Sequence, residues 1–131
     1  MEKLYSEKLR EKYGEVFVEI IRQDATIRES YLVDKKKTAY HYAIVFFGPD
    51  FSEVKGVDPE LPLGEALKSI DYKIKRQHID SFMVSLSKLM KKKFKTEKKE
   101  ALAKTIRLIA QKGHNVLDIG RIVEVYNPEF K

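Results

Sequence analysis

Residues 26–47, TIRESYLVDKKKTAYHYAIVFF, contain the clearest structural pattern in the sequence. Its two ends, Thr26–Val33 and Ala39–Phe47, are rich in β-branched and aromatic residues, and the polar residues 34–38 connect them. That pattern predicts an antiparallel hairpin with a solvated turn. In the second strand both sets of alternating residues are largely apolar. We therefore expect both faces of the sheet to be covered there, one by helices and the other by a ligand or partner.

Two charged residues interrupt otherwise apolar strands. Arg28 lies in the first strand of the hairpin, and Glu124 alternates with Ile122 and Tyr126 in a predicted closing strand, Asp118–Tyr126. A charge on a covered face costs free energy unless it is paired. The two residues therefore neutralise each other, or one points to solvent, or they converge on a small anionic ligand. In the last case the guanidinium binds a carboxylate, and the glutamate, with a pKa raised by its partly apolar site, could act as an acid.

The composition restricts the class of protein. A chain of 131 residues, 43% of them hydrophobic, suits a single domain over residues 1–131 with its own core. It has no cysteine, and its three histidines lack the spacing of a zinc-binding helix, so we expect no metal. The net charge of +6 favours association with anions, whether nucleic acid or small carboxylates. The longest strongly apolar run, Ala43–Phe47, is far shorter than the roughly 20 residues that span a bilayer, which predicts a cytoplasmic protein without a membrane partner.

The rest of the chain predicts helices and strands around the hairpin. In order, these are a helix Glu2–Tyr13, a strand Glu15–Gln23, a loop Gly48–Gly64, a short helix Gly64–Ile70, and two amphipathic helices, Arg76–Lys93 and Glu97–Lys112. The two later helices are predicted from apolar residues that recur at helical spacing. The expected fold class is α+β: an antiparallel sheet, a meander of about four or more strands, with three to four helices packed on one face.

The sequence also fits a second function, nucleic-acid binding. Residues 110–125, AQKGHNVLDIGRIVEV, fit a helix-turn-helix with Gly113 in the turn, and lysine-rich helices would suit phosphate contacts. Against this, the expected recognition helix contains Asp118 and Glu124 and a single arginine, Arg121. Nucleic acid therefore remains a possible partner beside a small anionic aromatic ligand.

Four parts of the chain together resemble the chorismate lyase family, whose fold is shared by the UTRA ligand-sensing domains. Residues 5–25 resemble its helix, glycine turn and first strand, and residues 27–49, with Ile27-Arg28-Glu29, resemble its central hairpin. Residues 61–79, with Pro62-Leu63-Gly64, resemble its Pro-Leu-Gly loop and the segment that follows. Residues 122–128, IVEVYNP, resemble its closing strand.

The resemblance implies a function and a set of site residues. The family eliminates pyruvate from chorismate to leave 4-hydroxybenzoate, without metal or cofactor. Arg28 matches the arginine that binds a ligand carboxylate, Glu124 matches the glutamate near the phenolic or ether oxygen, and Leu63 and Tyr5 match positions whose backbone contacts the ligand. The arginine of the family's second hairpin strand is absent here, and His41 is the nearest polar candidate. Two further candidates for ligand binding are Arg22 and Gly64.

Overall fold

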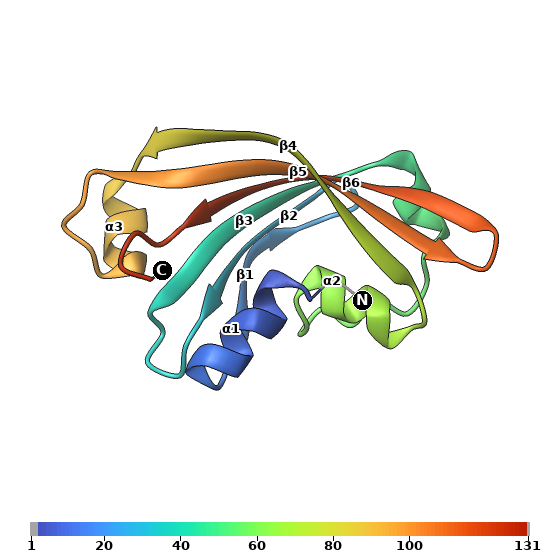
Figure 1. The fold of residues 1–131 in the computed structure, drawn as a ribbon, viewed down its shortest axis with the longest axis horizontal. Helices are drawn as coiled ribbons and strands as arrows, with labels where there is room; N and C mark the ends of the chain where they lie inside the picture. Colours follow the sequence, from blue (N-terminus) through green and yellow to red (C-terminus); the bar gives the residue numbers. More distant parts are fainter. Residues whose placement is uncertain (1–2, 131) are drawn as a thin grey trace.

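The computed structural model describes residues 3–130 (Figure 1). In chain order its elements are α1 (Tyr5–Tyr13), β1 (Phe17–Gln23), β2 (Ile27–Val33), β3 (Ala39–Phe47), the 3-10 helix η1 (Pro49–Glu53), α2 (Leu63–Ser69), β4 (Lys73–Ser85), α3 (Lys88–Phe94), β5 (Glu100–Lys112) and β6 (Asn115–Tyr126). The predicted hairpin is confirmed as β2 and β3, and the predicted helix at the amino end as α1. Glu2, at the expected start of that helix, lies outside the described residues.

The six strands form one antiparallel sheet in the order β1-β2-β3-β6-β5-β4. This arrangement confirms the expected α+β class with an antiparallel sheet and three α-helices. The topology also repeats, because α1-β1-β2-β3 is followed by α2-β4-β5-β6, with α3 inserted between β4 and β5. The last strand of each half, β3 and β6, pair with each other at the centre of the sheet.

Two helices cover one face of the sheet. Leu9 of α1 packs with Leu32 of β2, and Leu67 of α2 packs with Val45 of β3, in clusters of buried apolar side chains. Strand residues two apart point to the same side, so α1 and α2 lie on the face that carries Arg28. Figure 1 shows both helices side by side beneath the sheet.

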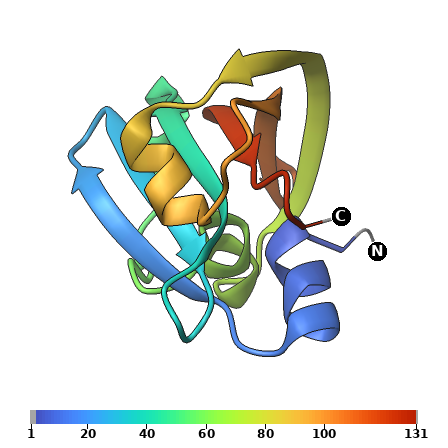
Figure 2. The same cartoon turned by 90° about the vertical axis from the view of Figure 1, so that its left-hand side faces the viewer.

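The third helix lies against the opposite face. Phe94 of α3 packs in a cluster with Tyr31 of β2 and Val125 of β6, which alternate with the residues on the α1 and α2 side. Lys93 of α3 also forms an ion pair with Glu19 of β1. Figure 2 shows α3, in orange, on the other side of the strands from α1. The third helix therefore departs from the expected one-sided arrangement, and only α1 and α2 can cover a site on the Arg28 face.

The structure contradicts the two amphipathic helices predicted from the sequence. Arg76–Lys93 contains most of strand β4 and then α3 except for its last residue, and Glu97–Lys112 is mostly strand β5. Leu102, Ile106 and Ile109 fit a helical spacing, but the strand buries alternate residues instead, with Ile106, Leu108 and Ala110 in the core. When a long strand carries apolar residues on both of its faces, some of them recur three or four residues apart, and the sequence then resembles that of an amphipathic helix.

The predicted helix-turn-helix is also wrong. Gly113 lies in the tight turn of a hairpin between β5 and β6, so that residues 110–125 contain no helix. The positive φ of Gly113, 62°, fits this turn, because glycine adopts such angles without steric cost. Among residues 3–130 no helix is long and apolar enough to cross a membrane.

Candidate functional site

Three rows of side chains cross the centre of the sheet on the face covered by α1 and α2. The strand register defines them as Arg28–Val45–Ile122, Ser30–Ala43–Glu124 and Leu32–His41–Tyr126. The middle row has small side chains on two of its three strands, which leaves a hollow between the larger residues of the outer rows. The small side chains of Ser30 and Ala43 thus leave the space, and the strand register places the Arg28 guanidinium, the Glu124 carboxylate and the His41 imidazole around it.

That hollow is a cavity of about 60 Å³ between the sheet, α1 and the start of α2. Six of the seven site residues predicted from the sequence line it, namely Tyr5, Arg28, His41, Leu63, Gly64 and Glu124. Arg22 does not line it. Its side chain is 58% exposed and lies 3.9 Å from Glu29 on the other face of the sheet.

Arg28 is buried and has no counter-ion among residues 3–130. The residue is 2% exposed, and its Nη2 donates a hydrogen bond to the carbonyl oxygen of Leu61 at 2.9 Å. Its Nη1 is buried and has no hydrogen-bond partner. Burial lowers the pKa of the guanidinium, yet arginine stays protonated in proteins. A buried cation in this state is costly, and an anion in the cavity would offset that cost.

Glu124, in contrast, has several partners. Its Oε1 accepts hydrogen bonds from Arg76 Nη2 at 2.5 Å and from the Tyr126 hydroxyl at 2.7 Å, and its Oε2 lies 3.3 Å from His41 Nε2. Burial raises the pKa of this carboxyl, but His41 and Arg76 outweigh burial and lower the pKa to about 2. The raised pKa expected from the sequence is therefore wrong. Glu124 is ionised near neutral pH and can accept a hydrogen bond, but it cannot donate a proton.

His41 presents a second unpartnered atom at the cavity. It is 4% exposed, and while Nε2 faces Glu124, Nδ1 is buried without a partner. The ring of Tyr5 stacks on the imidazole with a centroid distance of 4.9 Å, and this contact holds the imidazole in place. Burial and the nearby Glu124 raise the pKa of Tyr5, so its phenol stays neutral.

The cavity is distinguished by chemistry rather than by size. Hollows of about 480 and 600 Å³ lie elsewhere on the surface, and neither contains any predicted site residue. Among residues 3–130, three buried side-chain polar atoms lack a hydrogen-bond partner, and two of them, Arg28 Nη1 and His41 Nδ1, belong to residues that line this cavity. Buried polar groups are nearly always satisfied, so two such atoms in one cavity indicate a ligand site.

Arg76 is the main site residue that sequence reasoning missed. It lines the cavity from β4 and makes the shortest contact to Glu124, at 2.5 Å. The sequence around it, Lys73-Ile74-Lys75, alternates polar and apolar residues as a strand does, and this was the available signal. The predicted helix obscured it.

Known proteins provide no direct indication of what this site binds. No protein-family model matches the chain, and a search of curated proteins finds no match either. The fold and the site define the molecule as an antiparallel α+β protein with a largely apolar cavity between its sheet and two helices, into which Arg28, Arg76 and Glu124 bring charge.

Proposed function

We propose that this protein binds a small aromatic carboxylate in the cavity between the sheet and α1 and α2. The observation that carries the proposal is Arg28, a buried guanidinium whose Nη1 has no partner and which makes no ion pair within the described residues. A carboxylate that accepts a hydrogen bond from Nη1 would satisfy this atom and neutralise the charge. Apolar side chains such as Val45, Ile122 and Leu63 surround the space and suit an aromatic ring.

The orientation of the ligand follows from the sheet. Arg28 and Glu124 lie two strands and one row apart, which puts their Cα atoms at about 12 Å by ordinary sheet spacings. A ring with a carboxylate at one end and a hydroxyl at the other suits such a pair. The ionised Glu124 would accept the hydroxyl hydrogen bond, so 4-hydroxybenzoate fits the polarity of both ends.

The cavity must enlarge to admit such a ligand. At about 60 Å³ it holds roughly four to six water molecules, whereas an apolar cavity that binds benzene measures about 150 Å³. If α1 moves to enlarge the cavity, the ion pairs of Glu7 with Lys68 and of Arg10 with Glu65, which join it to α2, have to open.

The resemblance to the chorismate lyase family suggests the reaction. All four positions that it implicates, Tyr5, Arg28, Leu63 and Glu124, line the cavity. We propose elimination of pyruvate from chorismate. The ring carbon that bears the hydroxyl loses a proton, the adjacent carbon–ether bond breaks with its electron pair on oxygen, and the enolpyruvate that leaves takes up one proton to become pyruvate. The ring becomes 4-hydroxybenzoate, and the balance requires no oxidant or reductant.

Thermal unfolding with added ligand tests the binding proposal. We expect millimolar 4-hydroxybenzoate to raise the unfolding midpoint of the wild type, because a ligand that binds only the native state stabilises it. Arg28→Met should abolish the shift, while Arg22→Met, outside the cavity, should retain it. Duplex DNA at matched ionic strength serves as the control for nonspecific anion binding. An equal ligand shift in Arg28→Met would contradict the proposal.

Pyruvate release from chorismate tests the reaction separately. The expected result is pyruvate and 4-hydroxybenzoate in equal amounts, above the uncatalysed rate, with loss of that rate in Arg28→Met. Binding of 4-hydroxybenzoate without any pyruvate release would instead define the protein as a binder of aromatic acids and would overturn the lyase assignment.

A further inference from the structure

The positive charge of the chain is concentrated in two segments, residues 34–37 and 88–100, which we call the lysine-rich end. Together they contain ten lysines and three acidic residues, whereas the rest of the chain contains 16 basic and 17 acidic residues. The net charge of +6 therefore arises from these two segments alone. Such an uneven distribution attracts polyanions to one part of a molecule.

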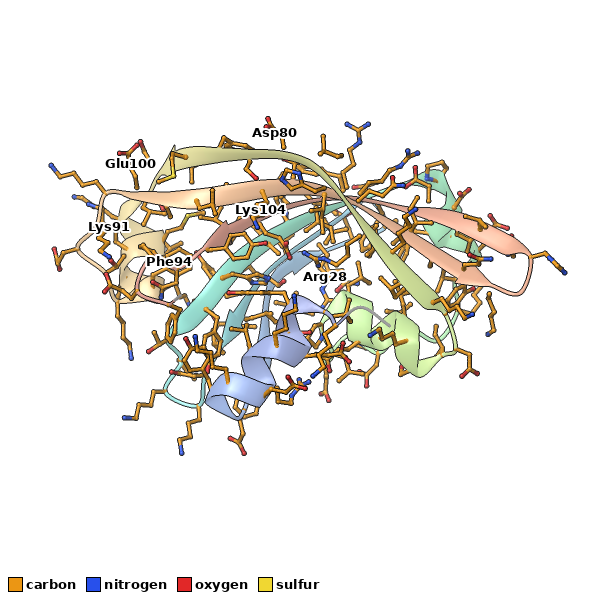
Figure 3. All side chains as sticks on the ribbon, viewed as in Figure 1. Arg28, Asp80, Lys91, Phe94, Glu100 and Lys104 are labelled. Carbon is orange, nitrogen blue, oxygen red and sulfur yellow. The ribbon has the colours of Figure 1, made fainter. Side chains whose placement is uncertain are left out.

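The fold brings the two segments together. The first lies in the β2–β3 turn, and the second contains α3 and the loop that leads into β5. The Nζ of Lys95 donates a hydrogen bond to the carbonyl oxygen of Lys36 at 3.3 Å and so joins them directly. Figure 1 shows α3 and the β2–β3 turn at the same end of the molecule. In Figure 3, Lys91 lies at that end, whereas Arg28 lies near the middle of the sheet.

Most lysines of the lysine-rich end have no counter-ion. Lys93 pairs with Glu19, and Lys98 lies 4.0 Å from Glu129, but within residues 3–130 the other eight make no ion pair. Seven of these eight are exposed, and the eighth, Lys91, is half-buried. A strand of phosphates that binds such lysines releases its condensed counter-ions, which drives association.

A hollow of about 480 Å³ lies beside the β2–β3 turn. Three aromatic rings line it, those of Tyr13, Tyr40 and Phe130, together with Lys35 and Lys36. The ring of Tyr13 stacks on that of Tyr40 with a centroid distance of 5.4 Å and is 38% exposed, so it offers aromatic surface to a ligand. Aromatic rings beside cations suit a nucleotide, whose base stacks on a ring while its phosphate contacts a lysine.

The two acidic residues at this hollow do not pair with its lysines. Asp34 Oδ1 accepts hydrogen bonds from the backbone nitrogens of Lys36 and Thr38, at 2.8 and 2.9 Å, and thereby fixes the turn. Glu15 is exposed and makes no ion pair in the described part of the chain. The side chains of the turn lysines therefore stay free to contact phosphates.

We propose that the lysine-rich end and the adjoining hollow bind single-stranded nucleic acid, with phosphates on the lysines of the β2–β3 turn and α3 and one base against the Tyr13 ring. A single strand fits better than a duplex, because its unpaired bases can turn out of the stack and reach a side chain. The hollow shares no residue with the cavity beside Arg28, so the inference is independent of the proposed function.

Fluorescence anisotropy with a labelled oligothymidine of about 12 nucleotides, over a series of salt concentrations, tests the phosphate contacts. Lys36→Gln combined with Lys92→Gln removes one exposed lysine from each segment. We expect an affinity at least about tenfold lower at low salt, and a salt slope smaller by about 1.4, since each phosphate contact with a single strand contributes about 0.7. Lys73→Gln combined with Lys75→Gln removes the same charge from the start of β4, away from α3, and should keep the wild-type slope.

A second variant tests the base contact. Tyr13→Leu keeps an apolar side chain beside Tyr40 but removes the ring, and it should lower the affinity for oligothymidine by roughly fivefold or more without changing the salt slope. Phe46→Leu removes an aromatic ring that is 48% exposed and does not line the hollow, and it should bind as the wild type does.

Three results would overturn the inference. The first is equal affinity of the wild type for oligothymidine and for its duplex with oligoadenosine, since the base contact requires an unpaired strand. The second is an unchanged salt slope in the Lys36→Gln and Lys92→Gln double variant. The third is binding to vesicles of anionic phospholipid without binding to oligothymidine, which would assign the lysine-rich end to a membrane surface instead.

Discussion

Arg28 and Glu124 line the same cavity but do not pair with each other. Glu124 receives hydrogen bonds from Arg76 and Tyr126 and contacts His41, whereas Arg28 has a single carbonyl partner. The carboxylate thus has three partners within the protein and can still accept one more hydrogen bond at Oε2, whereas Nη1 of the guanidinium has no partner within residues 3–130. This asymmetry makes Arg28 the residue whose environment is completed from outside the chain.

Removal of the Arg28 charge should stabilise the unliganded protein. Arg28→Met keeps most of the side-chain volume, loses one hydrogen bond to a carbonyl oxygen, and removes a buried cation that has no counter-ion in the described part of the chain. We expect the free energy of unfolding to rise by about 1–3 kcal/mol in urea titrations. Arg22→Met, at an exposed position, should change it by less than about 0.5 kcal/mol. A clear loss of stability in Arg28→Met would show that the guanidinium has a structural role that the cavity geometry does not explain.

Glu124 should make stability depend on pH in the acid range. Its pKa in the folded protein is about 2, below the ordinary 4.5, so its stabilising contribution is fully present above about pH 4.5 and is lost as the pH falls towards 2. At 1.36 kcal/mol per pKa unit the contribution is about 3 kcal/mol. Urea unfolding of wild type and Glu124→Gln from pH 7 to pH 3 measures it.

The difference in stability between wild type and Glu124→Gln should therefore be largest at pH 7 and shrink below pH 4.5. Glu53→Gln, at an exposed position in η1, is the control and should differ little from wild type throughout. A difference that grows as the pH falls would mean that the pKa of Glu124 is raised, and would restore its role as an acid.

His41 should occupy one tautomer. Because Nε2 faces the Glu124 carboxylate, the proton is expected on Nε2, with Nδ1 free to contact a ligand. Long-range proton–nitrogen NMR spectra of the unliganded protein report the protonation of each nitrogen, and addition of a bound ligand should shift Nδ1 more than Nε2. A proton found on Nδ1 alone, near neutral pH, would contradict the assigned contact with Glu124.

Two glycines should respond differently to substitution by alanine. At Gly120, where β6 passes β3, an added Cβ would lie 2.2 Å from the Phe46 carbonyl oxygen, and the φ angle is +145°. At Gly113, in the β5–β6 turn, nothing lies within 4 Å of the added atom. We expect Gly120→Ala to lower the free energy of unfolding by roughly 3 kcal/mol and Gly113→Ala by about 1 kcal/mol. Similar losses of unfolding free energy in the two variants would mean that the backbone of β6 at Gly120 has room for a Cβ atom beside β3.

The strands near the start of the chain were predictable because their residues follow the usual rules. The β2–β3 hairpin has β-branched and aromatic runs around a polar connector, and its period of two is clear. Strands β4 and β5 were not predictable in the same way. Apolar residues such as Phe82 and Met83 stay exposed on the edge strand β4, and a bulge near Ile79 shifts the alternation, so the pattern resembles a helix.

Part of the candidate site followed from local sequence, and part required the fold. A charge in an apolar strand identified Arg28 and Glu124 as candidates, because such positions are costly without a partner. Which partner each residue finds depends on strand order. Glu124 meets Arg76 only because β6 lies between β3 and β5, and no local pattern specifies that order. The lowered pKa of Glu124 follows from its contacts with His41 and Arg76, and because both contacts depend on strand order, local sequence could not predict it.

A crystal structure of the protein with bound 4-hydroxybenzoate would show whether the cavity beside Arg28 holds the ligand. The account predicts the ligand between the sheet and α1, with a carboxylate oxygen within hydrogen-bonding distance of Arg28 Nη1 and the hydroxyl directed at Glu124. Density for the ligand at another surface, or a ligand in the cavity whose carboxylate leaves Arg28 Nη1 without a partner, would contradict it.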